Sequence, residues 1–218
     1  MIRFEFTVST QTLIRTLLIV AVILLACHGA LTTYHYRVEE LPWLLRQIFD
    51  VDEEQTLPTW FSAFLLFIVS AFLWFCARRE RTSADRWVVY WYILSVGFLL
   101  MSVDEVAGIH ETLNSVIESH WAVGGGILAL VIGLCFVPFL LRLPRRTALQ
   151  FVVAGVVYIS GAVGIEILGQ PMDADTLAYN LLTLVEEGLE MFGVILFLHG
   201  LLDHVQRLEA NTVNPRAS

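Results

Sequence analysis

Three groups of acidic side chains interrupt apolar stretches of this chain, and each has the chemistry to bind a cation or carry a proton. An ionised carboxylate inside a membrane costs roughly 2.5 kcal/mol or more unless it is paired, hydrated or bound to an ion. The first group lies in the string Ser102-Val-Asp104-Glu105-Val-Ala-Gly-Ile-His110-Glu111. If one helix continues past Gly108, Asp104 and Glu111 share a face, and His110 lies about 100° around the axis from Glu111. A carboxylate and an imidazole on consecutive turns are typical of helices that hold a metal ion.

The other two groups are Glu166 and the run Glu186-Glu187-Gly188-Leu-Glu190. Gly161 and Gly164 precede Glu166, and such small residues allow a neighbouring helix to approach closely. Glu190 lies three residues after Glu187 and four after Glu186, so these carboxylates crowd one side of a helix. Because like charges repel, protons, cations or both must neutralise that side.

Carboxylates with one or two imidazoles, projecting inward from several helices, are the ligands of di-iron, di-manganese or zinc sites. We therefore expect a metal site for zinc, iron or manganese. Its candidate ligands are Asp104, His110, Glu111, Glu166, Glu186, Glu187, Glu190 and His35. In such a site Glu190 and Glu105 are the candidate catalytic groups, which would transfer protons. The Glu-x-x-His signature of soluble di-iron bundles is missing, so the identity of the metal stays open.

Each group also has a purely structural interpretation. The residues from Asp104 to Glu111 could lie in water at a helix end, whereas the run from Glu186 begins about two turns inside an apolar stretch. His28 is expected to be a core histidine. His199 and His204, which lie close to Asp203, are expected at the membrane surface.

The elements that must position these residues are membrane-spanning helices. The chain is 57% hydrophobic with a mean hydropathy of +0.71, which excludes an ordinary soluble domain. We predict an all-α polytopic bundle of six transmembrane helices, because about 20 apolar residues suffice to cross the bilayer. The spans are expected at residues 11–33, 58–77, 87–107, 121–141, 149–168 and 178–202. They form one domain, residues 1–207, and a disordered cytoplasmic tail follows at 208–218. The first stretch is expected to be an anchor rather than a cleaved signal peptide.

The basic residues predict the orientation. All 13 are arginine, and only Arg37 and Arg46 fall on one side of the predicted spans. The arginine-rich side is then cytoplasmic, with both termini inside, in the inner membrane of a bacterium. The first outward connection carries apolar residues at helical spacing after Pro42, which predicts a short amphipathic helix on the outer surface. The acidic string 52–54 that follows should stay in water.

This topology predicts that the acidic groups meet. The third and fifth spans end outward and the sixth begins outward, so all three groups lie at a similar depth below the outer surface. We expect them in one polar cavity.

The string Leu100-Met-Ser102-x-Asp104-Glu105-x-x-x-Ile109-His110-Glu111, with a later Glu-rich helix, resembles a motif of uncharacterised multi-pass bacterial membrane proteins. That resemblance covers the third to sixth spans and implies no established activity. The arrangement is also distantly similar to the ceramidase and adiponectin-receptor-like membrane hydrolases, which implies a zinc-dependent hydrolysis. The His-x-x-x-His of their final span is absent here.

Three functions compete at this point. The first is a metalloenzyme that acts on a lipid or quinone-like substrate from the outer side. The second is a cation or proton transporter or channel that uses the same acids. The third is an accessory subunit of a larger membrane complex. The chain has no lysine, which excludes a retinal protein because the Schiff base requires one. The expected partners are the lipid bilayer and a second copy or a larger complex, and no nucleic acid.

Overall fold

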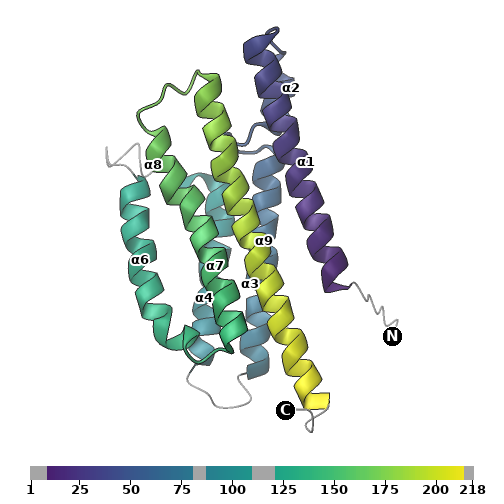
Figure 1. Cartoon of the computed structure of the whole chain (residues 1–218), viewed down its shortest axis with the longest axis vertical. Coiled ribbons are helices and arrows are strands. Elements are labelled where there is room, and N and C mark those ends of the chain that lie inside the picture. The colour runs from purple at the N-terminus through teal and green to yellow at the C-terminus, as the bar shows by residue number, and fades with distance from the viewer. Residues whose placement is uncertain (1–8, 81–86, 110–120, 214–218) are drawn as a thin grey trace.

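The computed structural model describes residues 9–80, 87–109 and 121–213, and within these ranges it contains helices and connecting turns but no strand. The helices, shown in Figure 1, are α1 (Thr10–Arg37), α2 (Trp43–Phe49), α3 (Leu57–Glu80), α4 (Val88–Ala107), α6 (Trp121–Leu140), α7 (Arg145–Ile159), the π-helix η2 (Ser160–Ile165), α8 (Glu166–Gly169) and α9 (Leu177–Val213). The predicted all-α fold is thereby confirmed.

Five described helical segments are long and apolar enough to cross a membrane, with a mean hydropathy of 1.4 to 2.4 in their best windows. They are Thr10–Arg37, Leu57–Glu80, Val88–Ala107, Val123–Leu140 and Arg145–Gly169. These lengths and compositions indicate a membrane protein. The sixth predicted stretch forms α9, which is longer than the others but carries the three glutamates of the run from Glu186.

Local sequence explains where the helices begin and end. The Ser9 hydroxyl accepts a hydrogen bond from the Thr12 backbone N–H at 3.1 Å and so caps α1. The predicted amphipathic helix is α2, which begins directly after Pro42. Gly108 adopts a left-handed conformation with φ of 53° and ends α4.

The structure differs from two expectations about helix ends. A shared face for Asp104 and Glu111 required one helix to continue past Gly108, but the helix that carries Asp104 ends there. The helix ends there because Gly108 adopts the left-handed backbone conformation that terminates helices. Glu111 itself lies outside the described residues. The predicted disordered tail from residue 208 is helical as far as Val213, and Glu209 forms an ion pair with Arg79 at 2.9 Å.

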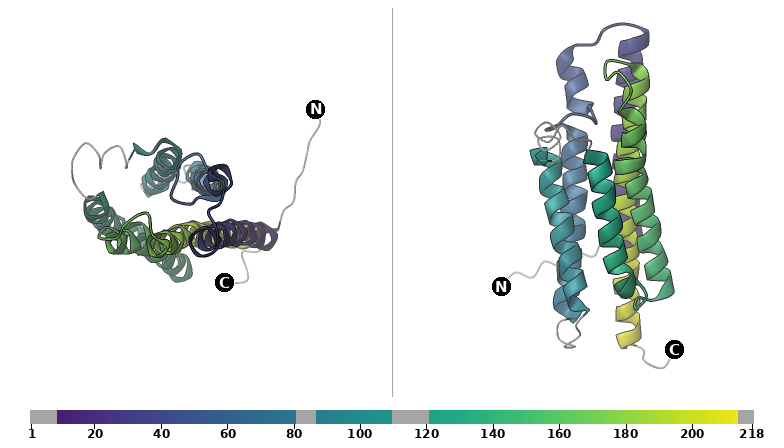
Figure 2. Two further views of the ribbon diagram at one scale, coloured as in Figure 1. Left: turned by 90° about the horizontal axis from the view of Figure 1, so that it is seen from above. Right: turned by 90° about the vertical axis from the view of Figure 1, so that its left-hand side faces the viewer.

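The helices lie in two layers. Seen from above in Figure 2, α1, α9, α7 and α6 follow one another in a row, and α3 and α4 lie together on one side of that row. Helix α9 contacts α1, α3, α7, η2 and α8, so it occupies the centre of the bundle. Trp91 of α4 and Leu198 of α9 belong to the hydrophobic core and are almost completely buried.

The two ends of the bundle differ in charge. The acidic end is where α4 and α8 end and α9 begins, and it carries the string 52–54, Asp104, Glu105, Glu166 and the run from Glu186. The arginine end is where α3 and α6 end and α7 begins, and it carries Arg78, Arg79, Arg142, Arg145, Arg146 and Arg207.

Candidate functional site: an acidic cluster near one end of the bundle

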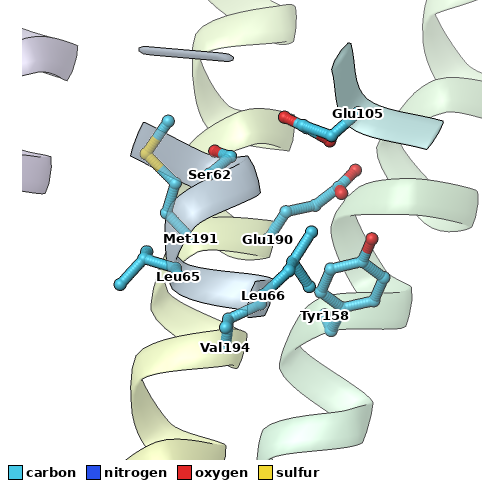
Figure 3. A pocket seen from close by; sticks show the side chains of 8 residues that line it. All are labelled: Ser62, Leu65, Leu66, Glu105, Tyr158, Glu190, Met191 and Val194. Atoms are coloured by element: carbon cyan, nitrogen blue, oxygen red, sulfur yellow. The ribbon is translucent and has the colours of Figure 1, made fainter. Parts of the chain in front are cut away.

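A small cavity lies between α3, α4, α7 and α9, towards the acidic end. It measures about 10 Å³, which is room for about one water molecule. Its lining combines acids, hydroxyls and apolar side chains: Ser62, Leu65, Leu66, Glu105, Tyr158, Glu190, Met191 and Val194. Figure 3 shows the carboxyl groups of Glu105 and Glu190 and the hydroxyl of Tyr158 following one another from top to bottom.

The polar groups of the cavity interact with one another. The Tyr158 hydroxyl and the Glu190 carboxyl group line the same cavity, and Glu105 lies close enough to act electrostatically on both. The buried Ser62 hydroxyl has no hydrogen-bond partner among the described residues. A bridging water between Ser62 and the acids would satisfy it, because buried hydroxyls are normally hydrogen-bonded.

Further carboxylates surround the cavity and extend the cluster towards the end of the bundle. Glu187 lies within electrostatic range of Glu105, Glu186 and Glu190. Glu186 interacts with Glu166, and both Glu186 and Glu187 are in range of Asp52 from the connection between α2 and α3. We call Glu105, Glu166, Glu186, Glu187 and Glu190 the acidic cluster. Like charges this close are tolerated only when protons or cations are shared among them.

At the acidic cluster, η2 and α7 pack closely against α9. A Cβ atom at Gly161 would lie 2.6 Å from the Glu186 carbonyl oxygen and 3.2 Å from Cγ of Glu190. A Cβ atom at Gly193 would lie 2.8 Å from the backbone nitrogen of Tyr158. Both positions therefore require glycine. Gly161 lies within η2, and single π-turns inside α-helices are frequent at functional sites.

The connection between α2 and α3 is held against the bundle by a buried histidine. The backbone N–H of Val51 donates to Nδ1 of His28 at 3.3 Å, and Oδ1 of Asp50 lies 3.6 Å from the same nitrogen. His28 is buried in the core, as expected, although its Nε2 has no hydrogen-bond partner among the described residues. It fixes the start of the acidic string and so brings Asp52 over α9. The expectation that this string lies apart in water holds only for its exposed side chains, because Glu54 packs against Gly108.

The predicted site residues are brought together in part. Glu105, Glu166, Glu186, Glu187 and Glu190 each lie within electrostatic range of other members of the acidic cluster. Of these five, only Glu105 and Glu190 line the cavity, so one polar cavity shared by all the predicted groups stays a prediction. From the pair Asp104 and Glu105 it is Glu105 that lines the cavity, whereas Asp104 lies half-buried in the last turn of α4. His110 and Glu111 lie outside the described residues.

His35 has other partners. Its Nδ1 accepts a hydrogen bond from the Leu41 backbone N–H at 3.0 Å, and its Nε2 lies 3.1 Å from Nη1 of Arg46. Both ring nitrogens are therefore occupied by the connection between α1 and α2, and His35 does not join the acidic cluster. Within the described residues no group of three or more His, Cys, Asp and Glu side chains has metal-binding geometry. The expected metal site stays a prediction.

Sequence reasoning missed three residues of the site. Tyr158 and Ser62 belong to apolar stretches with no motif around them, and only the packing of α3 and α7 against α9 reveals them. Asp52 belongs to an acidic string that looked like an ordinary solvated turn. A signal for Tyr158 does exist, because it precedes Gly161 by three residues and so lies on the same face of its helix.

Comparison with known proteins finds one matching family model, described as "Domain of unknown function (DUF8692)", over residues 16–205. The chain belongs to this family. The matched region includes every residue of the acidic cluster and of the cavity lining. Searches of curated proteins and of solved structures found no match. The function therefore has to be argued from the geometry of the site.

Proposed function

We propose that the protein moves protons across a membrane and that the acidic cluster is its outer proton-binding site. The observation that carries this proposal is the cavity of about 10 Å³ lined by Glu105, Glu190 and the Tyr158 hydroxyl. Carboxyl and phenol groups around a single water site are suited to passing protons, since each both donates and accepts them. A lipid or quinone-like substrate has no room there.

The charge of the cluster supports the same proposal. Glu187 and Glu190 lie beside each other on α9 and face Glu105 from α4. Three neighbouring carboxylates repel one another strongly in an apolar environment. Glu105, Glu187 and Glu190 would therefore be stabilised by taking up protons. Carboxyl groups that share protons exchange them readily, which is the property a proton relay requires.

The proposal includes a topology. Helix α9 is the sixth span, both termini lie in the cytoplasm, and the arginine end faces the cytoplasm of a bacterium across its inner membrane. The run from Glu186 can lie at membrane depth because it faces the bundle interior. Intramembrane acids that face the interior of a bundle are characteristic of proton and ion pathways.

Proton flux into liposomes tests the proposal. The full chain is reconstituted with a pH-sensitive dye inside the vesicles, and a potassium diffusion potential drives protons inward. Wild-type protein should conduct, and Glu190→Gln should lower the flux on the order of 10-fold or more, because an amide cannot carry the proton. The matched control is Glu40→Gln, which alters an exposed carboxylate at the same end of the bundle and should leave the flux unchanged.

The metalloenzyme expectation gives a different result. Purified protein would then contain stoichiometric zinc, iron or manganese that is lost in Glu187→Gln, and liposomes would show no proton flux. That combination contradicts proton transport. Flux that is equal in wild type and Glu190→Gln contradicts it as well.

A further inference from the structure

A second buried polar group lies at the arginine end, far from the acidic cluster. His204 of α9 is 5% exposed, and its Nδ1 lies 3.3 Å from Oγ1 of the fully buried Thr147. Its ring stacks on Trp91, with the ring centroids 5.6 Å apart. The other ring nitrogen, Nε2, is buried and has no hydrogen-bond partner among the described residues. A histidine in this state has a nitrogen ready to accept a proton or a water.

Charged groups connect His204 to the surface. On the same turn of α9, Asp203 forms ion pairs with Arg207 and with Arg146 of α7, the latter at 3.2 Å. On the opposite side of the ring, the Trp91 indole N–H donates to Oε2 of Glu80 at 2.7 Å. The charges that face His204 are thus Asp203, Arg207 and Arg146 on one side and Glu80, through Trp91, on the other. Burial of the ring and the Arg207 guanidinium disfavour a positive charge on the imidazole, and the Asp203 carboxylate favours it.

The packing of α7 against α9 joins the two groups. Thr147, Gln150, Ala154 and Tyr158 follow one another at i, i+3, i+7 and i+11, which places them on one face of α7. Tyr158 meets Gly193 of α9 next to the acidic cluster, Gln150 meets Gly200, and Thr147 meets His204. We call this line of contacts the α7–α9 seam.

Gln150 is the intermediate polar residue of the seam. Its side chain lies near Asp203, and its Oε1 is buried without a partner among the described residues. Two buried acceptor atoms that lack partners, Oε1 of Gln150 and Nε2 of His204, therefore lie at the arginine-end part of the seam. One or more waters there would satisfy both.

We propose that His204 is a second proton-exchange site, which passes protons between the acidic cluster and the cytoplasm along the α7–α9 seam. The proposal rests on the proposed function. With Nδ1 protonated and donating to the Thr147 hydroxyl, the lone pair of Nε2 accepts a proton from a water in the seam, and a carboxyl group of the acidic cluster reprotonates that water through the transient waters between them. The ring becomes an imidazolium, and Nε2 then releases this proton to a water at the arginine end. The net change is one proton moved from a carboxyl group to the cytoplasm, after which the carboxylate takes up a proton from the outer side.

The middle of the seam is lined by apolar side chains and separates the two sites. Phe151 and Phe197 stack there with ring centroids 4.3 Å apart, beside the buried Ala154. Along α9, Glu190 and His204 are 14 residues apart, which corresponds to about 21 Å. Protons must cross this zone on transient waters, so the aromatic pair acts as the barrier that prevents free leakage.

The same liposome assay tests this inference with the pH varied on each side separately. In wild type the flux should depend on the pH at the arginine end. In His204→Gln, which keeps a polar group near Thr147, the flux should fall on the order of 10-fold and lose that dependence. The matched control is His199→Gln on the same helix, which should behave as wild type.

A second variant guards against a folding defect. Thr147→Val removes the hydroxyl that orients the His204 ring and should lower the flux less than His204→Gln, and thermal unfolding in detergent shows whether each variant is folded. Unchanged flux and unchanged pH dependence in His204→Gln, together with the loss of flux in Glu190→Gln, would overturn the role of His204 and leave the proposed function standing. Absence of flux in wild-type protein would contradict both.

Discussion

At the scale of single residues, the contact between Gly108 and Glu54 decides how the acidic end closes. Gly108 has a φ of 53°, and a Cβ atom built on it would lie 1.4 Å from Oε1 of Glu54. Gly108→Ala should therefore destabilise the protein by about 1–3 kcal/mol, from backbone strain and from displacement of the Glu54 side chain. Thermal unfolding in detergent measures the change.

A double variant separates the two causes. Adding Glu54→Ala to Gly108→Ala removes the clash but leaves the left-handed backbone, so it should recover only part of the lost stability. Complete recovery would show that backbone strain contributes nothing. Equal stability of Gly108→Ala and wild type would contradict the left-handed end of α4.

The same scale shows what the sequence could and could not reveal about the site. The acids of the run from Glu186 were identifiable, because ionisable residues inside apolar stretches are functional by default. The sequence could not show whether Asp104 or Glu105 faces the cavity. Neighbouring residues of a helix point about 100° apart, and only the packing of α4 decides between them. Tyr158 has no sequence motif, and its role depends on Gly193 in a helix distant along the chain.

At the scale of helices, the α7–α9 contact depends on positions without side chains. Gly193→Ala would place a methyl group 2.8 Å from Tyr158 backbone atoms and should destabilise the protein by about 1–3 kcal/mol. The matched control is Gly155→Ala on α7, where a Cβ atom has no neighbour within 4 Å. That variant should be neutral or gain up to about 1 kcal/mol, since alanine favours helices. Equal effects of the two variants in thermal unfolding would contradict the close packing of these helices.

Hydropathy predicted the helices well because each apolar stretch needs a fixed length to cross a bilayer. Hydropathy could not predict where a helix changes its hydrogen-bonding pattern or ends early. The π-helix η2 depends on the fit of Gly161 against α9, and the end of α4 depends on a glycine inside an otherwise helical string. The extension of α9 to Val213 depends on tertiary contacts such as the pair of Arg79 and Glu209.

At the scale of the whole molecule, the charge difference between the two ends predicts the orientation in the membrane. With the three native cysteines replaced, Arg145→Cys should be protected from a membrane-impermeant thiol reagent in intact cells, and Glu40→Cys should react. Both positions are exposed in the fold, so only the membrane distinguishes them. Labelling of position 145 and protection of position 40 would reverse the topology.

The proposed proton site shared by Glu105 and Glu190 is tested most directly by an infrared pH titration of the purified protein. Subtracting the spectrum of Glu190→Gln from that of wild type isolates the carboxyl band of Glu190, and the same subtraction in a Glu105→Gln background shows whether the two groups are coupled. Because the two carboxyl groups face one cavity, the titration midpoint of Glu190 should shift by about 1 pH unit or more when Glu105 is replaced. An identical midpoint in both backgrounds would show that the two carboxyl groups titrate independently and would contradict the shared site.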